Sequence, residues 1–191
     1  APRLKVVNAL TDEEHPCQAL ADCLTLVEQW GSLRGRTLTF VGDGNNVAAS
    51  LAQAAVMLGA HVRVATPHGF ELPAGVRAGI EQVARHGATL ATTTDAVEGV
   101  TGADAVYTDV WASMGQEDEA SERREAFAGF TVDDELMARA AADAIFLHCL
   151  PAHRGEEVAA SVLEGPQTAV WEQATNRMHA QRGLIWWLLT Q

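Results

Sequence analysis

Short β-rich runs alternate with helix-like segments along most of this chain. The β-rich runs lie near residues 38–41, 61–65, 88–91, 105–108, 144–148 and 168–170. The segments between them, such as 46–58 and 75–86, carry apolar residues at helical spacing. Regular alternation of this kind is typical of βαβ units. We therefore expect an α/β fold: a Rossmann-like parallel sheet with helices on both faces.

Two further helices are expected to flank this unit. The first runs from about His15 to Trp30, with Pro16 at its first helical position, and the last runs from about Gln173 to Leu189. The expected organisation is a linking segment and interdomain helix over 1–34, an α/β domain over 35–172 and a C-terminal helix over 173–191. Thr131 is expected to cap a helix that starts in the acidic sequence after it.

Composition excludes several classes of protein. The 191 residues carry a formal charge of −12, which argues against a nucleic-acid surface. Three cysteines without a C-x-x-C pair, and no signal peptide, favour a reducing cytoplasm. The longest apolar stretch, 183–190, is far shorter than the roughly 20 residues of a membrane-spanning helix. The start at Ala1 without methionine, followed by the apolar segment 4–10, suggests excision from a longer polypeptide.

Three polar turns follow expected strands, at 42–46, 109–115 and 149–151. In an open parallel sheet, ligands bind outside the carboxyl ends of the strands. We therefore expect these turns to converge on one edge of the sheet and to form a binding site there.

The turn Gly42-Asp43-Gly44 favours an amino acid ligand over a dinucleotide. Val47 stands where a dinucleotide fingerprint has its third glycine, and the expected second strand ends without an acid for the ribose. A dehydrogenase-type nucleotide domain is therefore disfavoured. Asn45 and Asn46 offer amide groups near a helix start, which suit a carboxylate or an amino acid backbone. A tight turn with a capping asparagine explains the same residues equally well.

The other two turns carry an acid and a thiol. Asp109 and Ser113 are suited to an ammonium group, although an aspartate after a strand is often only a turn residue. Cys149 is either an unreactive side chain that fills space or a reactive thiol at the sheet edge. In the second case, His148 sets the protonation of the thiol and Pro151 fixes the turn that follows. Sequence neighbours on a strand point to opposite faces, so Cys149 and His148 are not expected to form a protease-like dyad.

Two positions are suited to an anion. His15 and Gln18 lie three residues apart in the first turn of a helix, whose free N–H groups attract negative charge. Arg177 near the last helix start could clamp a phosphate. A capping histidine, an ordinary glutamine and a surface cation are the plainer interpretations.

Taken together, these stretches resemble the ornithine carbamoyltransferase family over essentially the whole chain. The sequence from His15 to Gln18 is similar to the carbamoyl phosphate element, 109–115 to the ornithine loop and 148–151 to the catalytic loop. The runs 42–46 and 176–178 also match, in the expected order.

The resemblance implies transfer of the carbamoyl group of carbamoyl phosphate to the δ-amino group of L-ornithine, without cofactor or metal. The catalytic residues it implies are Cys149, Asp109 and His15. The implied ornithine-binding residues are Asn45, Asn46, Asp109, Ser113 and Met114. The implied carbamoyl phosphate-binding residues are His15, Gln18, Cys149, Leu150 and Arg177. Cys149 is expected to lower the pKa of the δ-amine and to accept its proton.

Complete members of the family carry an earlier domain with a Ser-Thr-Arg-Thr loop, which is absent from this sequence. The resemblance therefore implies an ornithine-binding half with little or no activity alone, from a trimer-based homo-oligomer. A non-catalytic amino acid binding module and a transferase for another amine, such as putrescine, stay open. Asp109 with Ser113 and Met114 favours ornithine. The helix end 184–189 is apolar all round, so we expect self-association or a swapped helix, unless it docks on its own sheet.

Overall fold

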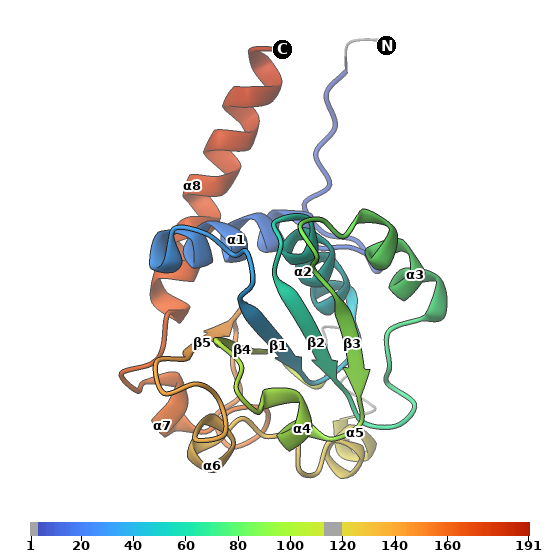
Figure 1. Cartoon of the computed structure of the whole chain (residues 1–191), viewed down its shortest axis with the longest axis vertical. Helices are drawn as coiled ribbons and strands as arrows, with labels where there is room; N and C mark the ends of the chain where they lie inside the picture. The colour runs from blue at the N-terminus through green and yellow to red at the C-terminus, as the bar shows by residue number, and fades with distance from the viewer. Residues whose placement is uncertain (1–3, 113–119) are drawn as a thin grey trace.

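A parallel five-stranded sheet forms the centre of the computed structural model, which describes residues 4–112 and 120–191. The strands are β1 (Thr37–Val41), β2 (His61–Ala65), β3 (Leu90–Thr93), β4 (Ala105–Thr108) and β5 (Ile145–His148). Their order is β3-β2-β1-β4-β5, and each neighbouring pair is parallel (Figure 1). The predicted α/β fold with a parallel sheet is confirmed.

Helices cover both faces of this sheet, as predicted. They are α1 (Pro16–Trp30), α2 (Asn46–Met57), α3 (Ala74–Val83), α4 (Ala96–Val100), α5 (Ala120–Ala126), α6 (Asp134–Met137), α7 (Ala160–Leu163) and α8 (Val170–Leu189). Leu38 and Phe40 of β1 belong to an apolar cluster with α1, α2 and α3, whereas Val41 belongs to a second cluster with α4, α6 and α7. Because alternate strand residues face opposite ways, one apolar run supplies two cores.

Three sequence expectations are corrected. The run 168–170 is not a sixth strand, because α8 already begins at Val170; Thr168 makes only a single parallel bridge to Phe146. The last helix therefore starts three residues before position 173. Thr131 does not cap α6, since the side chain of Asp133 accepts the hydrogen bond from the Leu136 N–H at 2.8 Å. The domain boundaries at 34 and 172 stay a prediction.

The chain reverses direction across the sheet between β1 and β4. β2 and β3 lie on one side of β1, while β4 and β5 lie on the other. The turns that follow β1 and β4 therefore leave in opposite directions from adjacent strand ends, which is where open α/β sheets bind ligands. Gly44 is required in the first of these turns, because a Cβ there would lie 2.6 Å from the backbone of Phe70 and Leu72.

A buried polar contact joins α1 to α8. Asp22 of α1 is fully buried, and its Oδ1 accepts hydrogen bonds from Gln18 Nε2 at 2.7 Å and Gln173 Nε2 at 2.6 Å. Gln173 Oε1 in turn accepts the His148 N–H at 2.9 Å, at the end of β5. One helical turn further on, Asn176 of α8 donates to the hydroxyl of Thr25 at 3.0 Å. Polar groups therefore set how α8 packs against the sheet domain.

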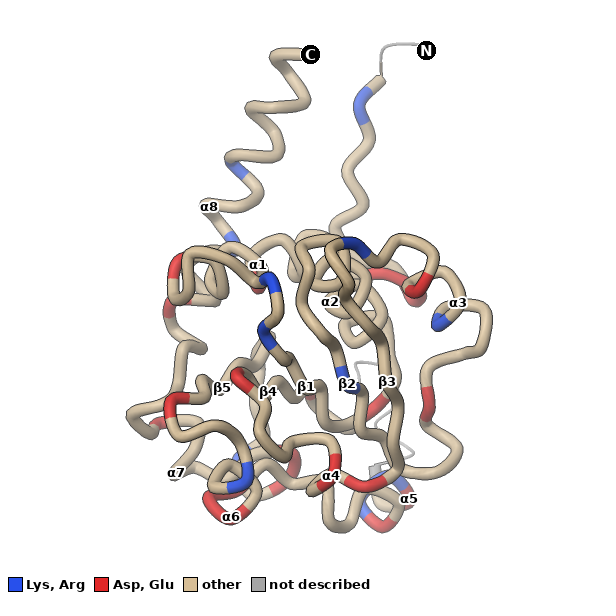
Figure 2. Tube along the Cα trace, in the orientation of Figure 1, with Lys and Arg blue, Asp and Glu red and all other residues tan. Residues whose placement is uncertain are grey.

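The end of α8 and the N-terminal segment project away from the sheet domain (Figure 1). Both projections carry few charges (Figure 2). Trp186 is 68% exposed and Leu189 is 76% exposed, while Leu4 and Val6 of the N-terminal segment are also exposed. Within residues 4–112 and 120–191, none of the helices combines the length and the apolar character needed to cross a lipid bilayer. These apolar side chains are exposed to solvent in the single chain.

The buried Asp22 predicts a pH-dependent stability. Burial raises the pKa of its carboxyl from 3.8 to about 7, although hydrogen bonds from Gln173 and Gln18 and the charge of Arg177 oppose the shift. The folded chain therefore keeps a proton that the unfolded chain releases, so stability falls as pH rises from about 4 to 7, by about 4 kcal/mol in all. We expect Asp22→Asn to remove most of this slope in urea unfolding at pH 5 and pH 8.

The matched control for this prediction is Thr25→Val, which removes a buried hydroxyl from the same helix contact and does not titrate. Its slope should equal that of the wild type. The other titratable groups coupled to Asp22 are Cys23, Tyr107 and Cys149. An Asp22→Asn variant with the full wild-type slope would show that Asp22 is not the group responsible.

The exposed helix end predicts self-association of the 191-residue chain. We expect the double variant Trp186→Lys, Trp187→Lys to shift sedimentation velocity toward the monomer, because two charges would line the apolar patch. Trp171→Lys is the control, since Trp171 is 50% exposed but lies at the opposite end of α8. A strictly monomeric wild-type chain at high concentration would contradict the prediction.

Candidate active site

Asp109 lies at the centre of the candidate site, immediately after β4. Its Oδ1 accepts hydrogen bonds from the Cys149 thiol and from the Val110 N–H, each at 2.8 Å. Its Oδ2 accepts from Asn45 Nδ2 at 2.9 Å. The carboxylate is 7% exposed and thus holds three donors from three turns. The expected convergence of these turns at one sheet edge is therefore present.

Asn45 caps a helix, as one interpretation of its sequence position predicts, while its binding of a ligand stays a prediction. Its Oδ1 caps α2 by accepting from the N–H groups of Val47 and Ala48, both at 3.0 Å. The other end of the same amide donates to Asp109. Because the cap fixes the side chain, the amide nitrogen is held toward the site.

The Cys149 thiol is partly buried and acts as a hydrogen-bond donor. Burial raises its pKa well above the ordinary value, and the adjacent Asp109 carboxylate raises it further. Cys149 therefore holds its proton at neutral pH. A thiol that holds its proton cannot accept another, so the acceptor in this pair is the Asp109 carboxylate, and the expected role of Cys149 as a proton acceptor is a prediction that requires the thiolate.

His148 organises the turn and makes no hydrogen bond to the Cys149 thiol, although a ring nitrogen of His148 lies within 4.8 Å of the Cys149 sulfur. Its Nδ1 accepts the Leu150 N–H at 2.8 Å, so the ring proton lies on Nε2, which faces Glu157 Oε1 at 3.3 Å. Both His148 and Glu157 are fully buried. Leu150, held by this contact, has a φ of 57° and precedes a cis peptide bond to Pro151. The sequence analysis did not identify Glu157, because an acid in the pair Glu156-Glu157 is typical of an exposed surface.

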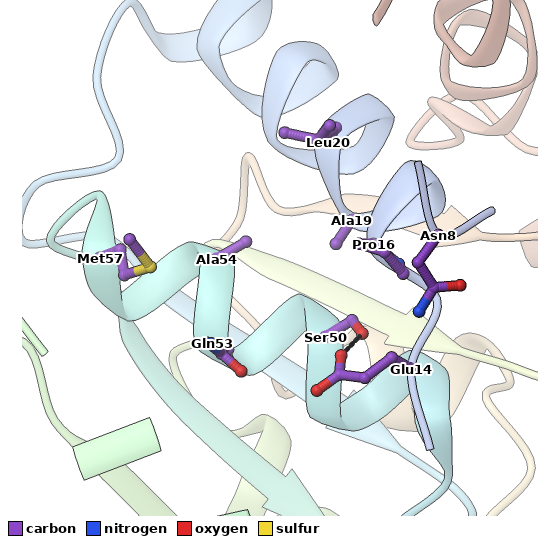
Figure 3. A pocket seen from close by; sticks show the side chains of 9 residues that line it. All are labelled: Asn8, Glu14, Pro16, Ala19, Leu20, Ser50, Gln53, Ala54 and Met57. Atoms are coloured by element: carbon purple, nitrogen blue, oxygen red, sulfur yellow. Dashed lines mark hydrogen bonds between the residues drawn. The ribbon is translucent and has the colours of Figure 1, made fainter. Parts of the chain in front are cut away.

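His15 is held at the start of α1 by its backbone. Its N–H donates to Ser50 Oγ at 2.8 Å, and the same hydroxyl donates to Glu14 (Figure 3). Burial lowers the pKa of His15, and the charge of Arg177 lowers it further, while a hydrogen bond to Ala9 and the Asp109 charge oppose the shift. The imidazole is therefore neutral at pH 7. Within the described residues its buried Nδ1 has no hydrogen-bond partner, which leaves it open to a ligand.

Gln18 and Arg177 meet across the two flanking helices. Arg177 Nη1 of α8 donates to Gln18 Oε1 of α1. Among the described residues, the buried Nε of Arg177 has no partner. Since Arg177 and Asp109 both act on the pKa of His15, the helix starts and the turn after β4 belong to one neighbourhood.

Some predicted residues take other places. Asn46 lines a cavity of about 590 Å³ together with Asn45, but its amide donates to the Thr11 carbonyl at 2.7 Å. Ser113 and Met114 lie outside the described residues. A second cavity, of about 360 Å³ between α1 and α2, contains none of the predicted site residues (Figure 3).

Sequence reasoning missed the ion pair between Asp43 and Arg123, which also lines the larger cavity. Arg123 Nη1 lies 2.7 Å from Asp43 Oδ2, donates to the Trp111 carbonyl and sits 5.2 Å from the centre of the Phe70 ring. Arg123 lies in the charged run 115–129, and such runs are typical of a solvated surface. The sequence therefore did not indicate that Arg123 is buried.

Among the residues that the structure describes, two clusters carry metal-binding residue types, namely Asp109, His148 and Cys149, and His153, Glu156 and Glu157. Internal hydrogen bonds already account for both. In the first, the His148 lone pair accepts the Leu150 N–H and the thiol donates to Asp109. In the second, Glu156 pairs with Arg124 and Glu157 accepts from His148.

Comparison with known proteins identifies the family. The family described as aspartate/ornithine carbamoyltransferase, Asp/Orn binding domain, matches residues 34–188. The chain is 57% identical over 183 residues to an ornithine carbamoyltransferase of Symbiobacterium thermophilum, and 56% identical over 185 residues to that of Acidothermus cellulolyticus. These alignments cover 95% and 96% of this chain but 59% of each relative.

A solved structure gives the same result. The ornithine carbamoyltransferase from Pyrococcus furiosus superposes with a TM-score of 0.90 at 51% identity, over 94% of this chain and 58% of that one. The chain therefore spans about 59% of the curated relatives it matches. The match over residues 34–188 shows that the chain belongs to the aspartate/ornithine carbamoyltransferase family, in its Asp/Orn binding domain.

Proposed function

We propose that this chain is the ornithine-binding part of an ornithine carbamoyltransferase. The enzyme transfers the carbamoyl group of carbamoyl phosphate to the δ-amino nitrogen of L-ornithine, giving L-citrulline and phosphate. The observation that carries the proposal is the cluster of Asn45, Asp109 and Cys149 beside His15. Relatives named ornithine carbamoyltransferase, at up to 57% identity, support ornithine as the acceptor.

The amino acid part of ornithine binds at the turns after β1 and β4. Asp109 supplies the negative charge that an ammonium group needs, and Asn45 and Asn46 supply amide groups beside it. Ser113 and Met114 share this role through the family resemblance. An ammonium that reaches Asp109 competes with the bonds the carboxylate now accepts from Cys149 and Asn45.

Carbamoyl phosphate binds between the flanking helices and the turn after β5. Arg177 offers a guanidinium and His15 a neutral imidazole, and each has a buried nitrogen without a partner among the described residues. Gln18, Cys149 and the Leu150 carbonyl complete this group. A charged donor and neutral donors together suit a phosphate with an attached carbonyl.

The reaction joins the two ligands at Cys149. The δ-nitrogen, once deprotonated, attacks the carbamoyl carbon; a C–N bond forms, the C–O bond to phosphate breaks, and phosphate leaves with the electron pair. The nitrogen's surplus proton passes to phosphate or solvent. Donors such as His15 that face the developing oxyanion are each worth about 3 to 4 kcal/mol in other enzymes. Holding two substrates together contributes about 7 kcal/mol or more.

We further propose an oligomeric state, a cellular location and a cofactor requirement for the full-length enzyme. The full-length enzyme is a trimer-based homo-oligomer of the cytoplasm that needs neither cofactor nor metal, and this chain alone turns over little or no substrate. The low activity of this chain alone is supported by its length, which spans about 59% of the relative. Assembly with other chains is supported by the exposed apolar end of α8.

We expect Asp109→Asn to weaken binding of L-ornithine to this chain about 10- to 100-fold in calorimetry. The substitution keeps the shape but removes the charge, and a hydrogen bond to a charged group is worth about 1.5 to 3 kcal/mol. Asp104→Asn is the control. Asp104 precedes β4 where Asp109 follows it, and it pairs with Arg36 at the opposite sheet edge. Equal losses in both variants would argue against an ammonium site at Asp109.

Activity should depend on the part of the relatives that this chain does not span. We expect no citrulline from the 191-residue chain with ornithine and carbamoyl phosphate. Citrulline should form when the preceding part of the Symbiobacterium thermophilum relative is fused ahead of the chain. Ornithine binding without turnover by the fusion would favour a non-catalytic amino acid binding module, and turnover of putrescine in preference to ornithine would favour a different acceptor.

A further inference from the structure

A buried carboxylate lies behind both halves of the candidate site. Asp22 of α1 is fully buried and accepts hydrogen bonds from Gln18 and Gln173 through the same oxygen, Oδ1. Gln173 is also fully buried. Neither Asp22 nor Gln173 is among the predicted substrate contacts, but Asp22 binds Gln18 directly and Gln173 binds the backbone of His148, the residue before Cys149.

The carboxylate determines which end of each amide faces it. A side-chain amide has a donor end and an acceptor end, whereas Oδ1 of Asp22 accepts both hydrogen bonds when the carboxyl is ionised and also when its proton lies on Oδ2. Both glutamines therefore present Nε2 to Asp22 and direct Oε1 away from it. The Tyr107 side chain lies beside Asp22, and its pKa is raised by burial and by the charge of Asp22.

The two outward oxygens bind different elements of the site, α8 and the end of β5. Gln18 Oε1 accepts from the Arg177 guanidinium, at the carbamoyl phosphate end. Gln173 Oε1 accepts the N–H of His148 at 2.9 Å, and His148 is joined directly to Cys149. If either amide flipped, two nitrogens would face each other and its outer hydrogen bond would be lost.

We infer that Asp22 is a positioning residue that holds the flanking helices in register with the turn that carries Cys149, by fixing Gln18 against Arg177 and Gln173 against the backbone of His148. The inference rests on the proposed function, because Gln18 and Arg177 are proposed to bind carbamoyl phosphate and Cys149 is proposed to lie where the two substrates meet. Asp22 itself contacts no substrate.

The decisive comparison is between Asp22→Ala and Asp22→Asn in the active fusion protein. Asp22→Ala removes the acceptor, so we expect KM for carbamoyl phosphate to rise and kcat to fall, together lowering kcat/KM about 100-fold. Asparagine keeps one oxygen for both glutamines and places its NH₂ toward Tyr107. We expect Asp22→Asn to recover kcat/KM to within about fivefold of the wild type, because hydrogen-bond acceptance rather than charge is required.

Two further variants separate positioning from general stability. Thr25→Val breaks another buried contact between α1 and α8, with Asn176, and should leave both kinetic constants unchanged. Gln173→Met removes the branch from Asp22 through Gln173 to His148 and leaves Gln18 bound to Asp22, so it should lower kcat by a larger factor than it raises KM for carbamoyl phosphate. This variant keeps the test open even where Asp22→Ala fails to fold.

Nuclear magnetic resonance of the 191-residue chain tests the geometry without any substrate. The side-chain amide protons of Gln18 and Gln173 should exchange slowly with solvent in the wild type and in Asp22→Asn. In Gln173→Met the backbone amide of His148 should shift. Rapid exchange of both side-chain amides in the wild type would overturn the inference.

The outcomes distinguish this inference from the proposed function. A wild-type fusion that makes no citrulline contradicts the proposed function, while the amide exchange still decides whether Asp22 positions the glutamines. An active fusion in which Asp22→Ala behaves like Thr25→Val, or in which Asp22→Asn gives no rescue, overturns the inference alone.

Discussion

Parallel pairing of β1 with β4 is the constraint on which the site depends. The register places Val41 opposite Thr108, and the Thr108 hydroxyl donates to the Val41 carbonyl at 2.6 Å. The residues after each strand, including Asn45 and Asp109, are therefore delivered to the same edge. The chain runs on to β2 from one strand and to β5 from the other, so the turns diverge and leave room between them.

Burial sets the electrical character of this edge. The Cys149 thiol is kept protonated by burial and by Asp109, and burial keeps His15 neutral. Asp109 is thus an acceptor surrounded by neutral donors, and Arg177 is a cation supported by Gln18. Such an arrangement has one place for an ammonium group and another for an anion, within a chain whose overall charge of −12 offers no general attraction to phosphate.

The attachment of α8 explains how a buried polar contact and an exposed apolar helix end occur together. The first turns of α8 are held by Gln173 and Asn176, through contacts with Asp22 and Thr25. Directional hydrogen bonds of this kind fix an orientation more sharply than apolar packing does, and burying them unpaired is costly. The same helix can therefore be positioned accurately at the site while its far end, near Trp186, stays uncovered in the single chain.

The sequence by itself determined the sheet strands, the flanking helices, the three polar turns and the motif residues, because hydrophobic periodicity and turn chemistry are local properties. The run 168–170 failed as a strand for the same reason: β-rich composition cannot report that α8 starts at Val170. Only the tertiary structure decided partners, such as Cys149 with Asp109, 40 residues apart, or Gln173 with Asp22, 151 residues apart. The tertiary structure also placed His148 against Glu157 and raised the pKa of Asp22. Both effects depend on burial and on neighbouring residues from other parts of the chain.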